Sequence, residues 1–481
     1  MRRREFFRIT RYARRYDRNA GKFLINIAYQ TRTDVTDRTV AVAEAFGLGV
    51  DEHREHVVYD NVELKISPRD IVYVTGDSGS GKSVLLDAIV RDLSPREAAR
   101  MSDVEIDPKK PLIDTVGRSI NEGLKLLSKV GLNDAFLFVR RYTQLSEGQK
   151  YRYRLAKLLE SQAQWWIMDE FCSMLDRDTA KIVAYNVQKL ARKEGKAVVA
   201  ATTHADLFDD LRPSVHIHKR FGKEIHVEYC TNELNRECSL AREMRVEEGN
   251  LEDYRQLVQF HYRQGGHPPL RNVFRMKRGD ELVGVILYCY PPITLIGRKK
   301  VFRRKFTPQE VNQRFVIISR VVVHPKYRTI GLGVKLVQET MPRVGLPFIE
   351  AIAVMAQYNP FFEKAGMTKI MERFPSHNIL DAIENLRELG FNPMLLGSTK
   401  YNLERLKRMN RTELKACKEI LTSVRNPRLK KFADSHAPYG KQAEYRQAVN
   451  KASLKKVAKM LKALSFLAQT KVYLLWENEE V

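Results

Sequence analysis

The chain has 481 residues, and its 83 lysines and arginines exceed its 58 aspartates and glutamates by 25. This length is sufficient for about three domains. The longest apolar runs, such as 283–290 and 315–318, are far shorter than the roughly 18 residues that a membrane-spanning helix needs. The five cysteines form no disulfide framework, which is typical of a reducing compartment. These features argue against an integral membrane protein and a disulfide-rich secreted domain, so we expect a cytoplasmic protein with no membrane partner.

The positive charge is concentrated towards the two ends of the chain. Residues 1–22 contain nine basic and two acidic side chains, and residues 401–481 contain 18 basic and eight acidic ones, with Tyr and Phe interspersed. Lysine and arginine release the counterions that condense on nucleic acids, and aromatic rings stack on bases. The pattern therefore predicts a nucleic-acid partner, DNA or RNA. A solvated basic surface that supports solubility or stability is the alternative.

An apolar stretch, 71–75, runs directly into Gly76-Asp-Ser-Gly-Ser-Gly81-Lys82-Ser83. Glycines at this spacing let backbone N–H groups point at phosphate oxygens, and the lysine adds a positive charge beside them. The run predicts a phosphate-binding loop between a strand and a helix. The expected nucleotide ligands are Gly76, Ser78, Gly79, Gly81, Lys82 and Ser83.

Four further motifs follow this loop. The segment Leu145-Ser-Glu-Gly-Gln149 lies about sixty residues later, and an apolar run at 165–168 ends in Asp169 and Glu170. Ser173-Met-Leu-Asp176 comes next, and a second apolar run at 197–203 precedes His204. In this order and spacing, the motifs resemble those of the ABC-type ATPase family. The resemblance implies an α/β, P-loop ABC-type ATPase domain at residues 51–240 that uses ATP and Mg²⁺.

The resemblance also gives each motif a role in phosphoryl transfer, where catalysis depends on positioning and charge neutralisation. Lys82 would contact the β and γ phosphates, and Ser83 with Asp169 would hold Mg²⁺. Glu170 would polarise the attacking water, and His204 would sense the γ phosphate.

In this family the signature segment completes the nucleotide site of a second copy. Ser146 and Gly148 would therefore act in trans across an ATP-sandwiched, head-to-tail homodimer. Gln149 and Asp176 are the remaining expected nucleotide ligands.

Two features depart from the pattern of ABC transporters. No glutamine occurs between Ser83 and Gln144, so the glutamine that usually contacts the metal is missing, and Asp114 is a candidate for its place. The segment between the phosphate loop and the signature is also short. It leaves little of the helical subdomain that docks on membrane spans.

The pattern of elements changes near residue 243. A predicted helix at 251–262 and a hairpin at 273–290 precede an apolar strand at 315–323, which runs into Arg328-Thr-Ile-Gly331-Leu-Gly333 and a helix at 334–341. This succession resembles the GNAT acetyltransferase core, whose loop holds the pyrophosphate of an acyl-CoA at a helix N-terminus. It implies a GNAT-fold α+β acyltransferase domain over 243–375. Its cofactor would be acetyl-CoA or another acyl-CoA, bound at Arg328, Gly331 and Gly333.

The acceptor side of this domain differs from common GNAT enzymes. The tyrosine that many members place before a Glu-Lys-x-Gly stretch is Phe362 here. Tyr358, one helical turn earlier, is a candidate acid for the leaving thiolate, and a core aromatic is the alternative. His261 is either an acceptor-side residue or a satisfied imidazole. The pairs His261-Tyr262 and Ser319-Arg320 faintly resemble the Mom-type branch of GNAT-fold enzymes, which modify DNA bases.

As a whole, the chain resembles ABC-type ATPases fused to a predicted acetyltransferase, known chiefly from archaea. A basic arm at 1–50 would precede the two domains, and a basic, mainly helical region at 376–481 would follow them. Together with the clustered positive charge, the two domains predict an ATP-dependent acyltransferase that modifies tRNA, rRNA or a DNA base, with dimer closure controlling substrate engagement. Acetylation of a ribosomal or chromatin protein is one alternative. A non-catalytic ABC ATPase whose GNAT fold senses CoA or nucleic acid is the other.

Overall fold

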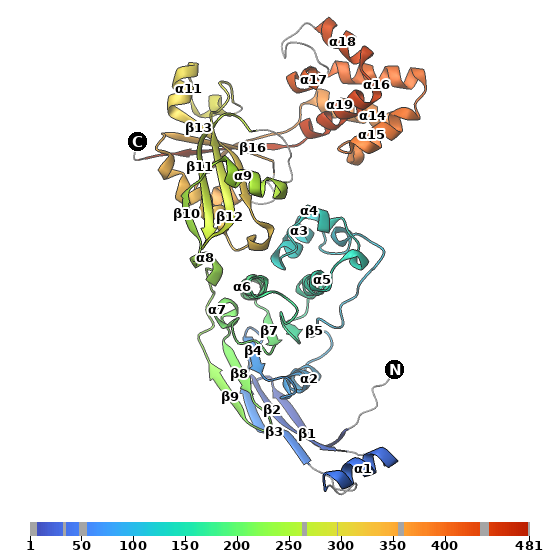
Figure 1. The fold of residues 1–481 in the computed structure, drawn as a ribbon, viewed down its shortest axis with the longest axis vertical. Helices are drawn as coiled ribbons and strands as arrows, with labels where there is room; N and C mark the ends of the chain where they lie inside the picture. Colours follow the sequence, from blue (N-terminus) through green and yellow to red (C-terminus); the bar gives the residue numbers. More distant parts are fainter. Residues whose placement is uncertain are drawn as a thin grey trace. The chain divides into compact units, whose positions relative to one another are not determined.

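The structure is a computed structural model that describes residues 7–31, 35–47, 55–261, 267–295, 297–354, 360–432 and 442–479. The chain divides into two compact units (Figure 1). The first contains Met1–Gly266, Asn272–Leu287 and Arg320–Thr340, and the second contains His267–Arg271, Tyr288–Ser319 and Met341–Val481. Within the described residues, no helix combines the length and the apolarity needed to cross a bilayer.

A six-stranded sheet in the first unit has the order β5-β6-β7-β4-β8-β9. Its strands are β4 (Ile71–Gly76), β5 (Ala98–Arg100), β6 (Trp165–Met168), β7 (Ala197–Ala201), β8 (Val215–Lys219) and β9 (Ile225–Tyr229). All neighbours are parallel except β9, which runs antiparallel to β8. Every residue of β4, β6 and β7 is buried, as expected for parallel strands covered on both faces.

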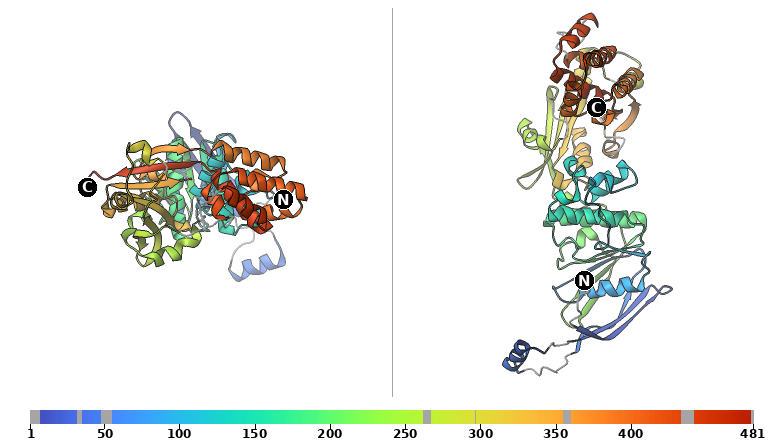
Figure 2. Two further views of the ribbon diagram at one scale, coloured as in Figure 1. Left: turned by 90° about the horizontal axis from the view of Figure 1, so that it is seen from above. Right: turned by 90° about the vertical axis from the view of Figure 1, so that its right-hand side faces the viewer.

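Alternate residues of these strands pack into two hydrophobic cores. Tyr73 and Trp166 face the core that contains α5 (Glu147–Glu160) and α6 (Arg177–Glu194). Val74 and Ile167 face the other core, which contains α2 (Lys82–Asp92). Figures 1 and 2 show α5 and α6 on one side of the sheet and α2 on the other. The arrangement follows from the two-residue period of a strand.

The N-terminal strands form a separate antiparallel sheet of order β1-β2-β3, with β1 (Phe7–Asp17), β2 (Lys22–Thr31) and β3 (Glu55–Lys65). Helix α1 (Asp37–Ala45) lies between β2 and β3 in the chain. We expected residues 1–50 to form a basic arm, but residues 7–31 form a hairpin of this sheet. The reason is the alternation of buried Phe23, Ile25 and Ile27, which pack in the same core as α2.

A seven-stranded mixed sheet has the order β10-β11-β12-β13-β14-β16-β15. Its strands are β10 (Arg245–Glu248), β11 (Leu270–Arg278), β12 (Glu281–Cys289), β13 (Phe315–Val323), β14 (Phe348–Ala353), β15 (Thr368–Arg373) and β16 (Lys471–Glu477). β13 pairs in parallel with β14 over Phe315–Ile318. β16 lies antiparallel to both β14 and β15.

Six helices of the second unit pack around a hydrophobic core of their own: α14 (His377–Glu388), α15 (Thr399–Lys407), α16 (Arg411–Ser423), α17 (Pro427–Phe432), α18 (Gln442–Lys451) and α19 (Leu454–Leu467). These helices account for most of the described residues of 376–481, where a mainly helical region was expected, and Asn410 caps α16 just after α15 ends. The chain then returns to the mixed sheet as β16. The nearly unbroken apolar run 472–476 suits such a strand between two neighbours.

The remaining helices are short connections around these layers. They are α3 (Ile120–Lys129), α4 (Ala135–Phe138), α7 (Phe208–Leu211), α8 (Ser239–Arg242), α9 (Leu251–Leu257), α10 (Arg298–Val301), α11 (Pro308–Arg314), α12 (Leu332–Thr340) and α13 (Phe361–Lys364).

A buried ion pair joins three of the second unit's elements. Arg298 of α10 donates through Nε and Nη2 to the carboxylate oxygens of Glu350, at 2.9 and 2.5 Å. The Tyr473 hydroxyl donates to the same carboxylate at 2.7 Å. Because Glu350 is fully buried, its charge depends on these donors, and the cluster fastens α10 and β16 to β14.

We predict that Glu350→Gln destabilises the second unit by about 3–5 kcal/mol, because Arg298 would keep a buried charge without its partner. Urea unfolding, combined with hydrogen exchange of β14 and β16, measures the effect. Glu384→Gln is the control, because the exposed pair of Glu384 with Arg387 contributes less than about 1 kcal/mol. Equal urea midpoints for the two variants would contradict the structural role of the cluster.

Candidate functional site

The phosphate-binding loop lies between β4 and α2, and its glycines have φ values that other residues rarely adopt. Gly76, Gly79 and Gly81 have φ of 139, 77 and 103°. A Cβ atom on Gly76 would lie 1.9 Å from the Lys219 carbonyl oxygen, and one on Gly81 would lie 2.5 Å from Val58 Cγ1. The loop backbone is therefore in close contact with β8 and β3, which only glycine permits at these two positions.

Lys82 closes this loop on itself. Its ammonium group donates to the carbonyl oxygens of Gly76 and Asp77, at 2.8 and 2.6 Å. Burial lowers the pKa of Lys82, whereas the negative charges of Asp169 and Asp77 act to raise it. Asp77, Ser78 and Gly79 are exposed in the loop, and Ser83 is exposed in the first turn of α2. All six expected phosphate ligands thus lie in one segment, with Asp169 close enough to act on the lysine.

The carboxylates and the histidine come from neighbouring parallel strands. Asp169 and Glu170 follow β6, and His204 follows β7, which lies between β6 and β4. Glu170 has φ of 52°, and its N–H donates to Asp169 Oδ1 at 3.0 Å. Tyr73 of β4 donates its hydroxyl to the His204 carbonyl oxygen. The carboxyl ends of parallel strands meet at one edge of a sheet, so the predicted catalytic residues and the loop share that edge.

The expected Mg²⁺ ligands, Ser83 and Asp169, lie at this same edge. Among the described residues, no group of three or more His, Cys, Asp or Glu side chains is placed to hold a metal ion. Mg²⁺ is typically bound by one or two protein oxygens together with phosphate and water oxygens. A hydroxyl and a carboxylate therefore fit a cation that arrives with a nucleotide.

The signature segment begins α5. Ser146 is the N-cap of this helix, where its Oγ accepts from the Gln149 N–H at 3.4 Å and its own N–H donates to Gln149 Oε1 at 3.1 Å. This reciprocal arrangement is a capping box. The Gln149 side chain is therefore hydrogen-bonded at the start of its own helix. Ser146 is exposed and Gly148 is half-buried.

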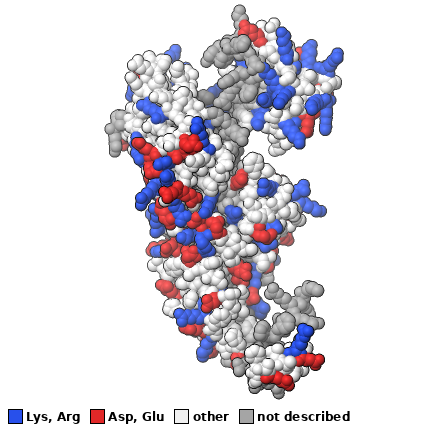
Figure 3. All heavy atoms as spheres, in the orientation of Figure 1, with Lys and Arg blue, Asp and Glu red and all other residues white. Residues whose placement is uncertain are grey.

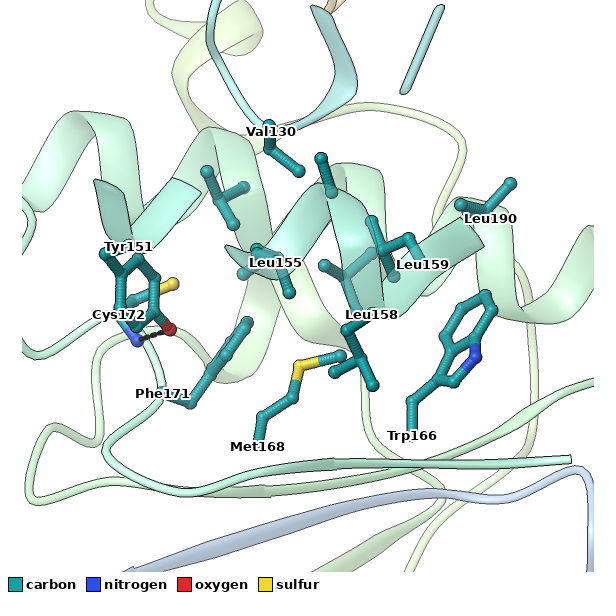
Figure 4. Packing of buried hydrophobic residues seen from close by; sticks show 14 of the residues in the cluster. Val130, Tyr151, Leu155, Leu158, Leu159, Trp166, Met168, Phe171, Cys172 and Leu190 are labelled. Atoms are coloured by element: carbon teal, nitrogen blue, oxygen red, sulfur yellow. Dashed lines mark hydrogen bonds between the residues drawn. The ribbon is translucent and has the colours of Figure 1, made fainter. Parts of the chain in front are cut away.

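Helix α5 is fastened to the turn that follows Glu170. The buried Tyr151 hydroxyl accepts from the Cys172 N–H at 2.7 Å (Figure 4). Cys172 itself has φ of 58°, and burial raises the pKa of Tyr151 well above its ordinary value. The signature helix and the turn that follows Glu170 are thus joined inside the core by a contact between residues 21 positions apart, which no sequence motif signals.

A pocket beside Asp169 contains residues that the sequence did not single out. Met101 donates its N–H to the Ile167 carbonyl oxygen at 3.1 Å, immediately after β5. The pocket is lined by Leu86, Asp87, Arg100, Met101, Ser102, Arg154, Ile167 and Asp169. Ser102 therefore lies beside the strand end that carries Asp169. Asp114 belongs to a short 3₁₀ helix, Leu112–Asp114. The pocket was not predicted because β5, which leads into it, has only three residues, too few for a recognisable strand pattern.

The second glycine loop lies between β13 and α12. Gly331 has φ of 90°, and space is open where a Cβ would be. The Arg328 guanidinium donates to the carbonyl oxygens of Val323, Asn133 and Phe260 at 3.0, 2.8 and 3.0 Å. Arg328 thus holds the loop in place with its side chain through three backbone carbonyl oxygens.

The two residues expected on the acceptor side are His261 and Tyr358. His261 directly follows Phe260, whose carbonyl oxygen accepts from Arg328, so it lies next to the second glycine loop. Its side chain is partly exposed. Tyr358 lies outside the described residues.

Comparison with known proteins places the first site in context. A family model described as the P-loop containing region of AAA domain matches residues 55–102. The cytochrome c biogenesis ATP-binding export protein CcmA of Vibrio parahaemolyticus serotype O3:K6 (strain RIMD 2210633) is 26% identical over 185 residues, which cover 32% of this chain and 89% of that protein. CcmA of Gluconobacter oxydans (strain 621H) is 30% identical over 169 residues, which cover 32% of this chain and 77% of that protein.

Among solved structures, the dimeric, ADP- and Pi-bound post-hydrolysis state of the ATP-binding cassette MJ0796 matches 37% of this chain and 92% of its own, at 20% identity and a TM-score of 0.31. The sequence relatives are matched over most of their own length by about a third of this chain. With this sequence similarity and the phosphate loop, signature helix and strand-end carboxylates described above, the chain belongs to the family of ABC-type P-loop ATPases.

Proposed function

We propose that the protein is an ATP-dependent acyltransferase that moves an acyl group from acetyl-CoA or a related acyl-CoA to a nucleic acid. In this proposal the ABC-type ATPase closes as a homodimer, and a GNAT-type domain that begins near residue 243 carries the transfer. The observation that carries the proposal is the second glycine loop, which joins β13 of a mixed sheet to the N-terminus of α12.

This loop is suited to a pyrophosphate. Peptide N–H groups at a helix start point out of the helix, and the aligned dipoles favour negative charge there. The space next to the Gly331 Cα, where a side chain would lie, is open. Arg328 positions the loop by donating hydrogen bonds to three backbone carbonyl oxygens. The parallel β13-β14 pair and the antiparallel β16 give a mixed sheet, in keeping with the α+β fold that the resemblance implies.

The acceptor proposal is supported by charge on α19. Lys455, Lys459 and Lys462 recur at helical spacing on one side of this helix, and Phe466 follows one turn later with 41% of its surface exposed. We call these four residues the α19 stripe. Lys462 Nζ lies 6.0 Å from the Phe466 ring centroid. Figure 3 shows Lys and Arg side chains gathered over the C-terminal helices with few acidic ones among them. Positive charge beside an exposed ring suits a phosphate backbone with unpaired bases.

We predict that the Lys455→Gln, Lys459→Gln, Lys462→Gln triple variant binds RNA and DNA more weakly. The slope of log affinity against log salt would fall by about 0.7–0.9 for each phosphate that the variant no longer neutralises. Fluorescence anisotropy at several salt concentrations measures it. The matched control replaces three exposed basic residues of the first unit, Lys109, Arg118 and Lys125, with Gln. An equal slope for the triple variant and wild type would contradict the role of the α19 stripe.

Dimer closure is the second part of the proposal. The chain carries one set of ATPase motifs, and its signature serine is exposed at the start of α5. The Glu170→Gln variant is expected to bind ATP without hydrolysing it. We predict that Mg-ATP converts this variant from a monomer of 55.8 kDa to a dimer of twice that mass, as measured by light scattering. Adding Ser146→Arg would leave it monomeric, with ATP binding intact. A monomer for Glu170→Gln alone, or a dimer for the double variant, would contradict the head-to-tail arrangement.

The transfer itself is tested with labelled acetyl-CoA, Mg-ATP and separate pools of tRNA, rRNA, duplex DNA and cell protein, followed by mass spectrometry. We predict label in one nucleic-acid pool. Gly331→Glu would reduce it at least tenfold, because a carboxylate would repel the pyrophosphate, and ATPase activity would remain. Gly345→Glu is the matched control, since Gly345 also has positive φ and open space but lies outside the loop. Label in protein alone would favour protein acetylation, and CoA binding without transfer would favour a sensor.

A further inference from the structure

The first turn of α6 connects the ATPase site to the second glycine loop. Asp176 is the N-cap of α6, and the three residues Asp176, Arg177 and Asp178 all make ionic contacts. Asp176 and Asp178 share the partner Lys326, whereas Arg177 pairs with Asp206. Lys326, which lies two residues before Arg328, bonds to Asp178 Oδ2 at 2.6 Å and lies 3.8 Å from Asp176 Oδ1. Asp176, the last residue of the Ser173-Met-Leu-Asp176 motif, thus lies close to the segment that leads into the second loop.

Asp178 is the centre of this network. Besides Lys326, the Arg278 guanidinium lies 2.9 Å from Asp178 Oδ1, and the Tyr327 hydroxyl lies 3.4 Å from Oδ2. Tyr327 also donates to Glu281 at 2.7 Å and is fully buried. Burial acts to raise the pKa of Asp178, but hydrogen bonds from Lys326 and Arg278 outweigh it and hold the pKa below its ordinary value. The carboxylate is therefore charged at neutral pH and held by charge-assisted bonds.

The same turn is bonded to the catalytic side. The Arg177 guanidinium makes two hydrogen bonds to Asp206, one of them at 2.9 Å, and Asp206 lies two residues after His204. Glu170 lies six residues before the N-cap, in a turn closed by bonds from Ser173 N–H to the Glu170 carbonyl oxygen and from Leu175 N–H to the Cys172 carbonyl oxygen. A shift of the helix start would therefore move Glu170 and the His204 segment together.

The second loop also rests on the middle of α6. Asn186 donates to the Thr329 hydroxyl at 2.9 Å, and Thr329 itself has φ of 76°. Asn133 donates to the Pro325 carbonyl oxygen at 3.3 Å and accepts from Arg328. Helix α6 buries eleven residues along its length, and the loop segment contacts it at two separate points, Asp178 in its first turn and Asn186 in its middle.

We propose that Lys326 and Tyr327 are positioning residues for ATP hydrolysis, and that they couple occupancy of the second glycine loop to the geometry of Glu170 through the first turn of α6. The identity of the loop's ligand as an acyl-CoA rests on the proposed function. The positioning role does not, because every contact in the network joins residues of this chain.

Steady-state ATPase kinetics of the full chain test the positioning role. Lys326→Met and Asp178→Asn would lower kcat by about tenfold, within the usual range of coupling between sites, with KM for ATP changed less than about twofold. Lys326→Arg would restore kcat, because it returns the charge. Arg255→Met is the control, since Arg255 forms an exposed pair with Glu252 and takes no part in the network. Thermal melting confirms that each variant is folded.

An unchanged kcat in both Lys326→Met and Asp178→Asn, or a raised KM at constant kcat, would overturn the proposal. Coupling is measured by titrating coenzyme A into Glu170→Gln with and without Mg-ATP. Linkage is reciprocal, so ATP would shift the affinity for coenzyme A, and Lys326→Met would remove the shift. A shift that survives Lys326→Met would also overturn the coupling. Absence of coenzyme A binding in every protein would refute the acyl donor of the proposed function, and the kinetics would still decide the positioning role.

Discussion

The close approach of the phosphate loop to β8 is the constraint on which the ATPase site depends. Gly76 pairs with Lys219 in the parallel ladder, and the missing side chain of Gly76 lets the two backbones touch. Lys219 is itself buried, and its ammonium group donates to the carbonyl oxygens of Arg220 and Gly222 at 2.6 and 2.5 Å. Backbone contacts therefore hold the phosphate loop against β8, and Lys219 closes the turn that follows this strand. A loop held by backbone contacts in this way has less conformational freedom to lose when it binds a ligand.

From this fixed loop the other parts of the site are positioned by the order of the sheet. β7 separates β4 from β6, which sets the spacing between the phosphate loop and the strand-end carboxylates. The turn after β6 contains two non-glycine residues with positive φ, Glu170 and Cys172. Each such conformation costs of order 1–3 kcal/mol and persists only where surrounding contacts enforce it. The Tyr151 hydroxyl supplies one of those contacts, so packing of the core helps to maintain the strained shape of the turn that carries Glu170.

The sequence predicted what is local and missed what is distant. The phosphate loop, the signature motif and the hairpin of β11 and β12 were recognised because each depends on residues close together in the chain. The place of Ser102 beside Asp169 was not, since it follows from strand order. The contact of Lys326 with Asp178 spans 148 positions, and in the sequence each residue alone resembles an ordinary surface charge. The same holds for β16, whose apolar run 472–476 predicts a strand only once its two neighbours are known.

The position of β16 has a consequence for how the protein forms during synthesis. β14 is synthesised more than a hundred residues before β16, and β15 about a hundred residues before it. Because β16 pairs with both strands, neither can complete its pairing until residues 471–477 have left the ribosome. The ATPase strands all precede residue 230, and domains generally fold as units during synthesis. The helices α14 to α19 must therefore be made while one edge of β14 is unpaired and β15 still lacks its partner in the sheet. Exposed edges of this kind can pair with strands of other chains. Early folding of the helical segment around its own core would therefore help β16 to pair with β14 and β15 sooner.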